Sequence, residues 1–334
     1  MARAETGVAV FGAGAWGTAL AIHIAHSGCK VLLWGHNEES VAAMAREHRN
    51  NRRLPGAEFP PGLTVTSSLD EAANANNWLL AVPSAAFRQT LIKLEPRLGP
   101  ATRLAWATKG LESSTAHFMH EILIEVLGDR LPYALVSGPS FAAEVARGLP
   151  TAVTVAASSS DLAHEVAGWL HHGALRVYTS DDVLGVELGG SLKNVLAIAA
   201  GISDGLGFGA NARAALITRG LVELMRLGEE LGARRETLIG LAGLGDLVLT
   251  CTDNQSRNRR FGLALARGLT AEEARTEVGA TVEGAETARV AVAKAVAVGI
   301  EMPICREVYK VLYEGLAPRD AVAELFARAP KAEL

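Results

Sequence analysis

The feature that most constrains the fold is a glycine-rich turn close to the start of the chain. The apolar run Val8–Phe11 leads directly into Gly12-Ala13-Gly14-Ala15-Trp16-Gly17, and a helix-like stretch continues to Ala25. This order is typical of dinucleotide-binding units: the first glycine makes the tight turn, the second lets the pyrophosphate approach, and the third lets the helix pack on the strand. The diphosphate then lies at the helix N-terminus, where N–H groups attract an anion. The alternative is a glycine turn that serves packing alone.

Alternating strand-like and helical stretches predict a parallel sheet in the first half. After the first strand, strand-like runs follow at Lys30–Trp34, Trp78–Val82, Arg103–Ala107, Tyr133–Val136 and Ala152–Ala157. This is the pattern of a mostly parallel sheet covered on both faces. Ligands of such sheets bind beyond the carboxyl ends of the strands, so we expect the loops after the early strands to converge on one cleft. Lys109 is then a candidate for binding a substrate anion or hydroxyl, the alternative being a lysine in solvent.

The end of the second strand bears on the choice of dinucleotide. An NAD-specific site would carry Asp or Glu there to hold the ribose 2′-hydroxyl. The chain has Gly35, His36 and Asn37 instead, and Glu38 and Glu39 are expected in the next helix. Without a carboxylate at this place a 2′-phosphate is not repelled, so NAD and NADP are both allowed. His36 is a candidate cofactor contact, the alternative being a histidine of a surface loop.

The second half of the chain predicts an all-helical domain. After Asp182 the strand signals largely stop, and amphipathic segments follow at Val183–Ala200, Ala212–Glu230, Gln255–Arg267, Gly284–Val298, Ile304–Tyr313 and Arg319–Arg328. Thr270 with Glu273 three residues later is a capping box that opens another helix. We therefore divide the chain into an α/β domain, 1–182, and an all-α domain, 183–334. Glycine-rich breaks at 201–209 and 240–252 are interpreted as a flexible segment and an apolar loop.

Lys193 is the candidate catalytic residue. It lies in a predicted helix, with Gly189 and Gly190 one turn before it and Ala197 and Ala200 after it. Side chains three and four apart share a helix face, so this lysine lies in a stripe of small residues that lets another backbone or a flat ligand come close. Burial there would lower the pKa of the amine and suit it to proton transfer. The alternative is a lysine that extends into solvent.

Two further stretches of the second half carry candidate polar groups. Asp246 lies in the predicted apolar loop, where an unpaired carboxylate would be costly. Just beyond it comes Ser256-Arg257-Asn258-Arg259-Arg260. Arginine binds phosphate through two parallel hydrogen bonds, and Ser and Asn add neutral donors, so this run predicts a phosphate site. The alternative is a basic helix start in solvent.

Composition and charge exclude several classes of protein. A chain of 334 residues with 49% apolar content can form two domains with separate cores. The net charge of −4 and the dispersed Lys and Arg residues give no sign of a nucleic-acid surface. The three cysteines, Cys29, Cys251 and Cys305, are far apart, which suits a reducing compartment. We expect no signal peptide, no membrane span and no metal site, since His117 and His120 lack further ligands.

Eight short blocks, taken in order, carry a resemblance to a known family. They are Gly12–Gly17, Ala81–Ser84, Ala107–Glu112, Ser137–Ala142, Leu188–Asn194, Asp204–Gly207, Gly243–Leu247 and Ser256–Asn258. With these blocks the sequence resembles bacterial NAD(P)-dependent sn-glycerol-3-phosphate dehydrogenase along nearly its whole length. Ser137-Gly138-Pro139-Ser140-Phe141-Ala142 and Leu192-Lys193-Asn194 are the blocks most specific to this group.

The resemblance implies a fold, an activity and a cellular role. The fold is a Rossmann-type domain followed by an all-helical domain like the C-terminal domain of 6-phosphogluconate dehydrogenase. The activity is the reversible, NAD(P)H-dependent reduction of dihydroxyacetone phosphate to sn-glycerol 3-phosphate for phospholipid synthesis. The implied partners are this small phosphate substrate and a second copy in a homodimer, in the cytoplasm, with no nucleic acid and no integral membrane association.

The resemblance also assigns roles to individual residues. Lys193 is implied as the proton donor and acceptor. The implied substrate contacts are Lys109, Gly138, Ser140, Lys193, Asp246, Ser256, Arg257 and Asn258. The implied cofactor contacts are Gly12, Gly14, Ala15, Trp16, Gly17, His36, Lys109, Ala142, Arg257, Thr281 and Glu283. His36 is a departure, because the family often has Arg there, and this leaves NADP preference open.

Two other functions compete with this interpretation. A β-hydroxyacid or 6-phosphogluconate type dehydrogenase would share the nucleotide domain, the helical domain and a catalytic lysine. A redox-sensing regulator would bind NAD(H) without chemistry, but it would need a DNA or partner surface, and the sequence contains no basic recognition helix.

Overall fold

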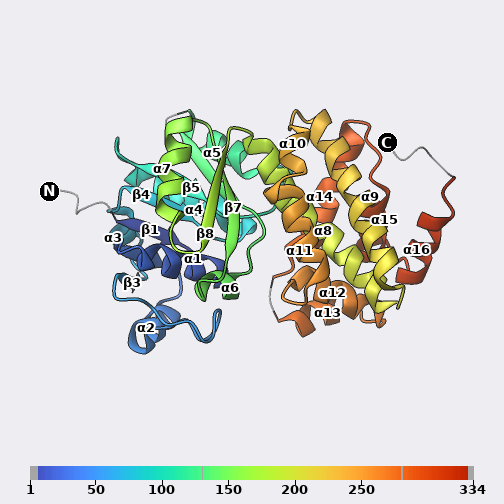
Figure 1. The fold of residues 1–334 in the computed structure, drawn as a ribbon, viewed down its shortest axis with the longest axis horizontal. Helices are drawn as coiled ribbons and strands as arrows, with labels where there is room; N and C mark the ends of the chain where they lie inside the picture. The colour runs from blue at the N-terminus through green and yellow to red at the C-terminus, as the bar shows by residue number, and fades with distance from the viewer. Residues whose placement is uncertain (1–6, 130, 280, 330–334) are drawn as a thin grey trace. The chain divides into compact units, whose positions relative to one another are not determined.

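The computed structural model describes residues 7–129, 131–279 and 281–329. The described residues up to Lys109, together with Met119–Val183, form one compact unit, here called unit 1. Gly110–Phe118 and the described residues from Leu184 onward form a second, unit 2. The division at 182/183 proposed above made no allowance for Gly110–Phe118, which leaves the first half of the chain to join the helical unit. Figure 1 shows the elements of both units.

Unit 1 is built on a single eight-stranded sheet (Figure 1) with the order β3-β2-β1-β4-β5-β6-β7-β8. Its strands are β1 Val8–Phe11, β2 Val31–Trp34, β3 Leu63–Thr66, β4 Asn77–Leu80, β5 Arg103–Trp106, β6 Tyr133–Ser137, β7 Thr151–Ala157 and β8 Leu175–Ser180. All pairs from β3 to β6 are parallel, β7 is antiparallel to β6, and β8 is parallel to β7. The expected mostly parallel sheet is thus confirmed.

The helices of unit 1 separate consecutive strands of the sheet. They are α1 Ala15–His26, α2 Glu38–Glu47, α3 Leu69–Ala73, α4 Ser84–Leu94, α5 Met119–Leu127, α6 Ala142–Ala146 and α7 Ser160–Leu170, with a 3₁₀ turn at Glu95–Arg97. Every residue of the central strands β1 and β4 is buried, so both faces of the sheet are covered. This is the reason that all residues of the two strands except Asn77 are apolar.

The two edge strands of the sheet were not predicted from the sequence. β3 and β8 each present exposed side chains, and β8 exposes Arg176, Tyr178 and Thr179. A strand at a sheet edge buries fewer side chains, so its apolar signal is short and mixed with polar residues. The pattern that reveals central strands is therefore weak at these two positions.

The topology places the candidate ligand loops of unit 1 at one edge of the sheet. Because β2, β1, β4, β5 and β6 run in parallel, their carboxyl ends lie together. The segments that follow these ends contain the glycine turn, His36, Pro83, Lys109 and Gly138. In open α/β sheets this edge is where ligands bind.

Unit 2 consists of helices around one long central helix (Figure 1). The helices are α8 Val183–Gly205, α9 Gly209–Glu230, α10 Arg235–Leu238, α11 Asp246–Thr252, α12 Arg257–Ala266, α13 Ala271–Val278, α14 Glu283–Ala297, α15 Pro303–Tyr309 and α16 Pro318–Phe326. Short π-helical turns occupy Leu241–Gly245 and Lys310–Glu314. The predicted capping box is confirmed, since Thr270 and Glu273 satisfy each other at the start of α13.

The central helix α8 is long and apolar enough to cross a membrane by length and composition alone. Its mean hydropathy over an 18-residue window is 1.4, and 89% of that window is buried inside the protein. All residues from Gly185 to Ser203 are buried by the surrounding helices. Its apolar character is therefore explained by its place in the core of unit 2.

The first glycine-rich break is not the flexible segment that the sequence suggested. α8 continues through Gly201 to Gly205 before the chain turns. A Cβ on Gly201 would lie 2.1 Å from the Arg259 carbonyl oxygen, and one on Gly262 would lie 2.1 Å from the Ile198 carbonyl oxygen. Paired glycines thus let the backbones of α8 and α12 touch, and the small residues serve helix packing.

The second glycine-rich break is helical as well, and the expected loop is wrong. A Cβ on Gly189 of α8 would lie 2.6 Å from the Ala242 carbonyl oxygen, and one on Gly243 would lie 1.9 Å from the Leu238 carbonyl oxygen. Gly189 thus lets the π-helical turn lie directly on α8, and Gly243 lets the turn fold back on α10. As the small-residue stripe beside Lys193 predicted, another backbone comes close to that helix, and it carries α11 to the lysine.

Candidate functional site

The three glycines of the turn after β1 differ in how closely the rest of the protein packs against them. Gly12 has a φ of 121°, and its Cβ would lie 2.7 Å from the Ala81 carbonyl oxygen. Gly17 is packed even more closely, because its Cβ would lie 2.0 Å from the Gly12 carbonyl oxygen. Gly14 has an ordinary φ of −76° and no atom within 4 Å of an added Cβ. The protein itself thus does not require glycine at position 14, which is where the sequence predicts the approach of the pyrophosphate.

The start of α1 fits the diphosphate of a dinucleotide. Gly14 is the N-cap and has no side chain to bond the first N–H groups, and the first turn contains no acidic residue. Backbone N–H groups and the helix dipole favour an anion at such an end. The indole Nε1 of Trp16 is buried, and within the described ranges it has no hydrogen-bond partner. Together with the open space over Gly14, these features suit the predicted cofactor contacts from Gly12 to Gly17.

His36 follows β2 and is exposed. Asn37 caps α2 by accepting a hydrogen bond from the Ser40 backbone N–H at 2.7 Å, so Glu38 and Glu39 belong to the helix. The residues between the end of β2 and α2 are therefore Gly35, His36 and Asn37, with no carboxylate among them. These three residues therefore present no negative charge that would repel a 2′-phosphate.

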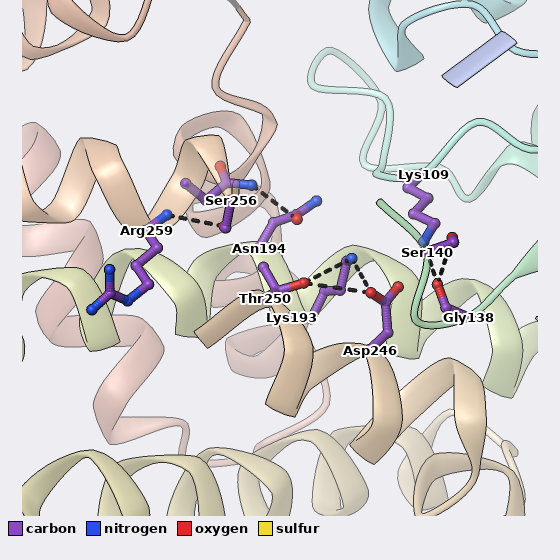
Figure 2. A network of polar contacts seen from close by, with 10 residues as sticks. Lys109, Gly138, Ser140, Lys193, Asn194, Asp246, Thr250, Ser256 and Arg259 are labelled. Carbon is purple, nitrogen blue, oxygen red and sulfur yellow. Dashed lines mark hydrogen bonds and ion pairs between the residues drawn. The ribbon is translucent and has the colours of Figure 1, made fainter. Parts of the chain in front are cut away.

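Lys109, Gly138 and Ser140 are brought together in unit 1, as Figure 2 shows. Lys109 Nζ donates to the Gly138 carbonyl oxygen at 3.1 Å, and Ser140 Oγ donates to the same oxygen at 3.0 Å. Gly138 has a φ of 145°, and its Cβ would lie 3.0 Å from Val153 Cα, so no other residue fits well there. Ala142 begins α6 directly after this segment. Three predicted substrate contacts thus share one carbonyl group.

Lys193 is held in unit 2 by two partners on α11 (Figure 2). Its Nζ donates to a carboxylate oxygen of Asp246 and to Thr250 Oγ1 at 3.0 Å. Thr250 Oγ1 also lies 3.4 Å from the same Asp246 oxygen. The Lys193 side chain is 10% exposed and that of Asp246 is 1% exposed. The ammonium is therefore buried, as predicted, and the carboxylate of Asp246 that would be costly alone is paired with it.

Thr250 and Asn194 are site residues that the sequence analysis missed. Thr250 lies four residues after Asp246 on α11, so both side chains share one helix face. That spacing would have revealed Thr250 had this segment been predicted as a helix rather than a loop. Asn194 follows Lys193, and its Oδ1 accepts from Asn258 Nδ2 at 2.9 Å. No pattern in the sequence signals a contact between residues so far apart.

Asn258 connects three helices of unit 2. Besides its bond to Asn194 on α8, its Oδ1 accepts from the Gly284 backbone N–H at 3.0 Å. A Cβ on Gly284 would lie 2.6 Å from the Asn194 carbonyl oxygen, so the start of α14 is in backbone contact with α8. The predicted residues Thr281, exposed, and Glu283, the first residue of α14, lie beside this contact.

Ser256 and Arg257 have distinct environments at the start of α12. Ser256 is buried and caps the helix, accepting from the Arg259 backbone N–H at 3.2 Å. Arg257 is exposed, and in the described part of the chain its guanidinium makes no hydrogen bond or ion pair. An arginine at a helix N-terminus with its donors available is suited to binding a phosphate.

Across the described ranges, no three His, Cys, Asp or Glu residues lie close enough together to hold a metal ion. His120 lies on α5, whereas His117 belongs to the Gly110–Phe118 segment of unit 2. These two histidines therefore do not lie on the same helix.

Known proteins share both the sequence and the fold. Residues 7–163 match the family described as NAD-dependent glycerol-3-phosphate dehydrogenase N-terminus, and residues 182–323 match its C-terminus. The chain is 60% identical over 327 residues to a glycerol-3-phosphate dehydrogenase [NAD(P)+] of Thioalkalivibrio sulfidiphilus, covering 98% of each chain. It is 55% identical over 328 residues to the enzyme of that name from Methylococcus capsulatus, again covering 98% of each.

Solved structures agree with this relationship. The crystal structure of glycerol-3-phosphate dehydrogenase from Coxiella burnetii matches with a TM-score of 0.94 and 48% identity, covering 97% of this chain and 99% of that one. Ketopantoate reductase from Ralstonia eutropha matches with a TM-score of 0.60 and 17% identity, which shows a shared fold alone. Since the family matches cover both units and the relatives align over nearly the full length, the chain belongs to the NAD-dependent glycerol-3-phosphate dehydrogenase family.

Proposed function

We propose that this protein reduces dihydroxyacetone phosphate to sn-glycerol 3-phosphate with NADH or NADPH, using Lys193 as the general acid. The observation that carries the proposal is the buried ammonium of Lys193, bonded to Asp246 and Thr250. Adding a hydride to a ketone leaves an alkoxide, which must receive a proton. A positioned general acid is typically worth about 10²–10⁴-fold in rate.

The partners of Lys193 define how the proton is handled. Asp246 and Thr250 hold Nζ at one place, so the proton donor is positioned before substrate binds. A bound nicotinamide supplies the hydride. Lys193 donates a proton to the carbonyl oxygen during reduction and takes one from the alcohol in the reverse direction. The carboxylate of Asp246 stays close to the ammonium and orients it.

The phosphate of the substrate has a separate set of candidate contacts. Arg257 is exposed with available donors, and Ser256 and Asn258 flank it. A guanidinium can bind a phosphate dianion through two parallel hydrogen bonds. We assign Lys109, Gly138 and Ser140 to the substrate as well, because their polar groups meet at one carbonyl. Thr281 and Glu283 remain assigned to the dinucleotide.

The proposed role in the cell follows from the product of the reaction. sn-Glycerol 3-phosphate is the backbone of glycerophospholipids, and we assign this protein to their synthesis in the cytoplasm.

We also infer a homodimer, because unit 2 exposes large apolar side chains such as Val296 and Phe326, 66% and 78% exposed. Sedimentation or light scattering of the purified protein tests this state; a monomer at micromolar concentration would contradict it.

A steady-state assay tests the activity. Purified protein is given NADH or NADPH and, in separate reactions, dihydroxyacetone phosphate, dihydroxyacetone and a β-keto acid. We expect dihydroxyacetone phosphate to have the highest kcat/KM with at least one of the two dinucleotides. Preference for the keto acid, or no turnover of dihydroxyacetone phosphate, would overturn the proposal.

A further inference from the structure

Two arginines lie two positions apart at the start of α12 and differ in exposure and in hydrogen bonding. Arg257 is exposed and, among the residues that the structure describes, has no polar partner. The side chain of Arg259 is 9% exposed, and all three of its guanidinium nitrogens are hydrogen-bonded. Arg259 therefore has little capacity left for a ligand, and its charge serves another purpose.

The contacts of Arg259 join three elements of unit 2. Nη2 lies 2.5 Å from an Asp204 carboxylate oxygen near the C-terminal end of α8. Nε donates to the Cys251 carbonyl oxygen at 3.1 Å, near the end of α11, and Nη1 donates to Asn254 Oδ1. One guanidinium thus connects α8, α11 and the turn 253–256 that leads from α11 to α12.

The turn that Arg259 holds carries the proposed phosphate contacts. Ser256 closes the turn and caps α12 through the Arg259 backbone N–H, and Arg257 is the first residue of the helix. Figure 2 shows Arg259 beside Ser256. The guanidinium contacts hold Cys251, just before the turn, and Asn254 within it, and the Arg259 backbone N–H holds Ser256 at its other end. The direction in which Arg257 projects therefore depends on Arg259.

The close crossing of α8 and α12 makes this arrangement possible. Gly201 and Gly262 bring the two helix backbones into contact, which places Asp204 opposite the third residue of α12. Asp204 also accepts from Arg213 Nη1 of α9 at 2.8 Å, so its carboxylate is held from two sides. The Asp204 side chain is 9% exposed, and a buried carboxylate orients a guanidinium firmly.

We propose that Arg259, held by Asp204, is a positioning residue for substrate phosphate, which it orders by fixing the turn that carries Ser256 and Arg257. The inference rests on the proposed function, because it takes Arg257 as the phosphate ligand. It predicts that loss of the guanidinium fork weakens recognition of the phosphate group and leaves the chemistry at Lys193 intact. A purely structural ion pair would lower the amount of active enzyme without changing KM.

The primary test is Arg259→Lys, which keeps the positive charge opposite Asp204 but has one nitrogen instead of three. We expect the KM for dihydroxyacetone phosphate to rise about tenfold, because a single ammonium cannot reach Asp204, Cys251 and Asn254 together. The kcat stays within about threefold, and the KM for the dinucleotide is unchanged. The kcat/KM for dihydroxyacetone, which has no phosphate, stays within about twofold.

Arg213→Lys is the matched control, since Arg213 binds the same carboxylate from α9. We expect its KM for dihydroxyacetone phosphate to equal that of wild type. Asn254→Ala is a second, milder variant that removes one contact of the guanidinium from an exposed residue, and it should raise this KM about threefold. It keeps the test valid if Arg259→Lys fails to fold.

Several outcomes would overturn the inference. They are an unchanged KM for dihydroxyacetone phosphate in Arg259→Lys and Asn254→Ala, or an equal loss of kcat/KM for the phosphorylated and unphosphorylated ketones. Failure of the proposed function looks different. In that case wild type itself does not turn over dihydroxyacetone phosphate, or Arg257→Lys leaves its KM unchanged.

Discussion

In unit 1 the residues proposed to receive the diphosphate lie within six consecutive positions, from Gly12 to Gly17. In unit 2 the ammonium of Lys193 meets partners that are 53 and 57 positions away along the chain. The glycine turn connects one strand to the next helix along the chain, and Gly12 also packs against the Ala81 carbonyl beyond β4. The Lys193 centre exists only after α8 and α11 have packed, and it buries two opposite charges in doing so.

This contrast suggests how each region responds to mutation. A change at Gly14 can affect the ligand without affecting the fold, because a Cβ added there would meet no atom of the protein within 4 Å. A change at Lys193 affects both, because its removal leaves the carboxylate of Asp246 buried without its main partner. The predictions below test this difference, beginning with the largest effect.

Replacing Lys193 by Met should reduce kcat by about 10²–10⁴-fold, since the alkoxide loses its proton donor. Binding of NADPH, measured by fluorescence titration, should be unchanged. Lys93→Met, on the exposed face of α4, is the matched control and should keep full activity. A kcat within tenfold of wild type would contradict the role of Lys193.

The stability of the Lys193→Met variant needs its own check. Breaking a buried ion pair costs roughly 3–5 kcal/mol because the remaining buried charge loses its oppositely charged partner. The double variant Lys193→Met with Asp246→Asn removes that charge, so its thermal midpoint should recover while its kcat stays low. If both variants were equally unstable, the carboxylate would not be the cause.

Glu223 in unit 2 and His23 in unit 1 should change the free energy of unfolding with pH in opposite directions. Burial raises the pKa of Glu223 on α9 to about 7, although its carboxylate accepts from the Ile304 and Cys305 backbone N–H groups. Folded protein then binds more protons than unfolded protein between pH 4.5 and 7, so this group removes roughly 3 kcal/mol of stability as pH rises through that window. Burial lowers the pKa of His23 on α1. The unfolded protein therefore binds more protons than the folded protein below pH 6.5, and the free energy of unfolding falls as pH falls through that range.

Glu223→Gln tests the first half of this statement. Its thermal midpoint relative to wild type should rise between pH 5 and pH 8, because the uncharged amide no longer responds to pH. Glu229→Gln, on an exposed carboxylate of the same helix, is the control and should show a constant difference. A constant difference for Glu223→Gln as well would mean that its carboxyl titrates normally.

The elements that the sequence predicted well are those whose signal is local. β1, the glycine turn and α1 follow from a run of residues whose roles are set by backbone geometry. The capping box at Thr270 is likewise contained in four positions. A central strand also reveals itself, because burial on both faces favours a run of apolar residues.

The elements that were missed depend on contacts between distant residues. The helical course of α8 through Gly201 is stabilised by α12, and the sequence shows only a glycine that would favour a break. Thr250 and Asn194 acquire their places only when α11 and α12 pack on α8. The Gly110–Phe118 segment joins unit 2 through Gly110, whose N–H donates to Ser191 Oγ at 3.1 Å. None of these contacts has a periodicity that marks it in advance.

Gly14→Val tests the local nature of the turn. The φ and ψ of Gly14 suit any residue and an added Cβ meets no atom, so the thermal midpoint should stay close to that of wild type. The dissociation constant for NADH should nevertheless rise about 10–100-fold, because the side chain occupies the space that the pyrophosphate approaches. Gly17→Val is the contrasting variant, and it should be strongly destabilised by its contact with the Gly12 carbonyl. Unchanged affinity in Gly14→Val would show that the dinucleotide lies elsewhere.

The smallest expected effect concerns the choice between NADH and NADPH. His36 is exposed directly after β2, where the residues before α2 include no carboxylate. His36→Arg should lower the KM for NADPH about three- to tenfold and leave the KM for NADH nearly unchanged, because a guanidinium can bind a 2′-phosphate through two hydrogen bonds. This decrease in the KM for NADPH should become smaller at high salt, because salt screens the attraction between the guanidinium and the phosphate. His164→Arg is the control, because it adds the same charge on α7. This helix follows β7, which runs antiparallel to β6, so it starts at the end of the sheet away from the carboxyl ends of the parallel strands. An equal gain from both variants would mean that net charge, rather than a contact at position 36, attracts the phosphate.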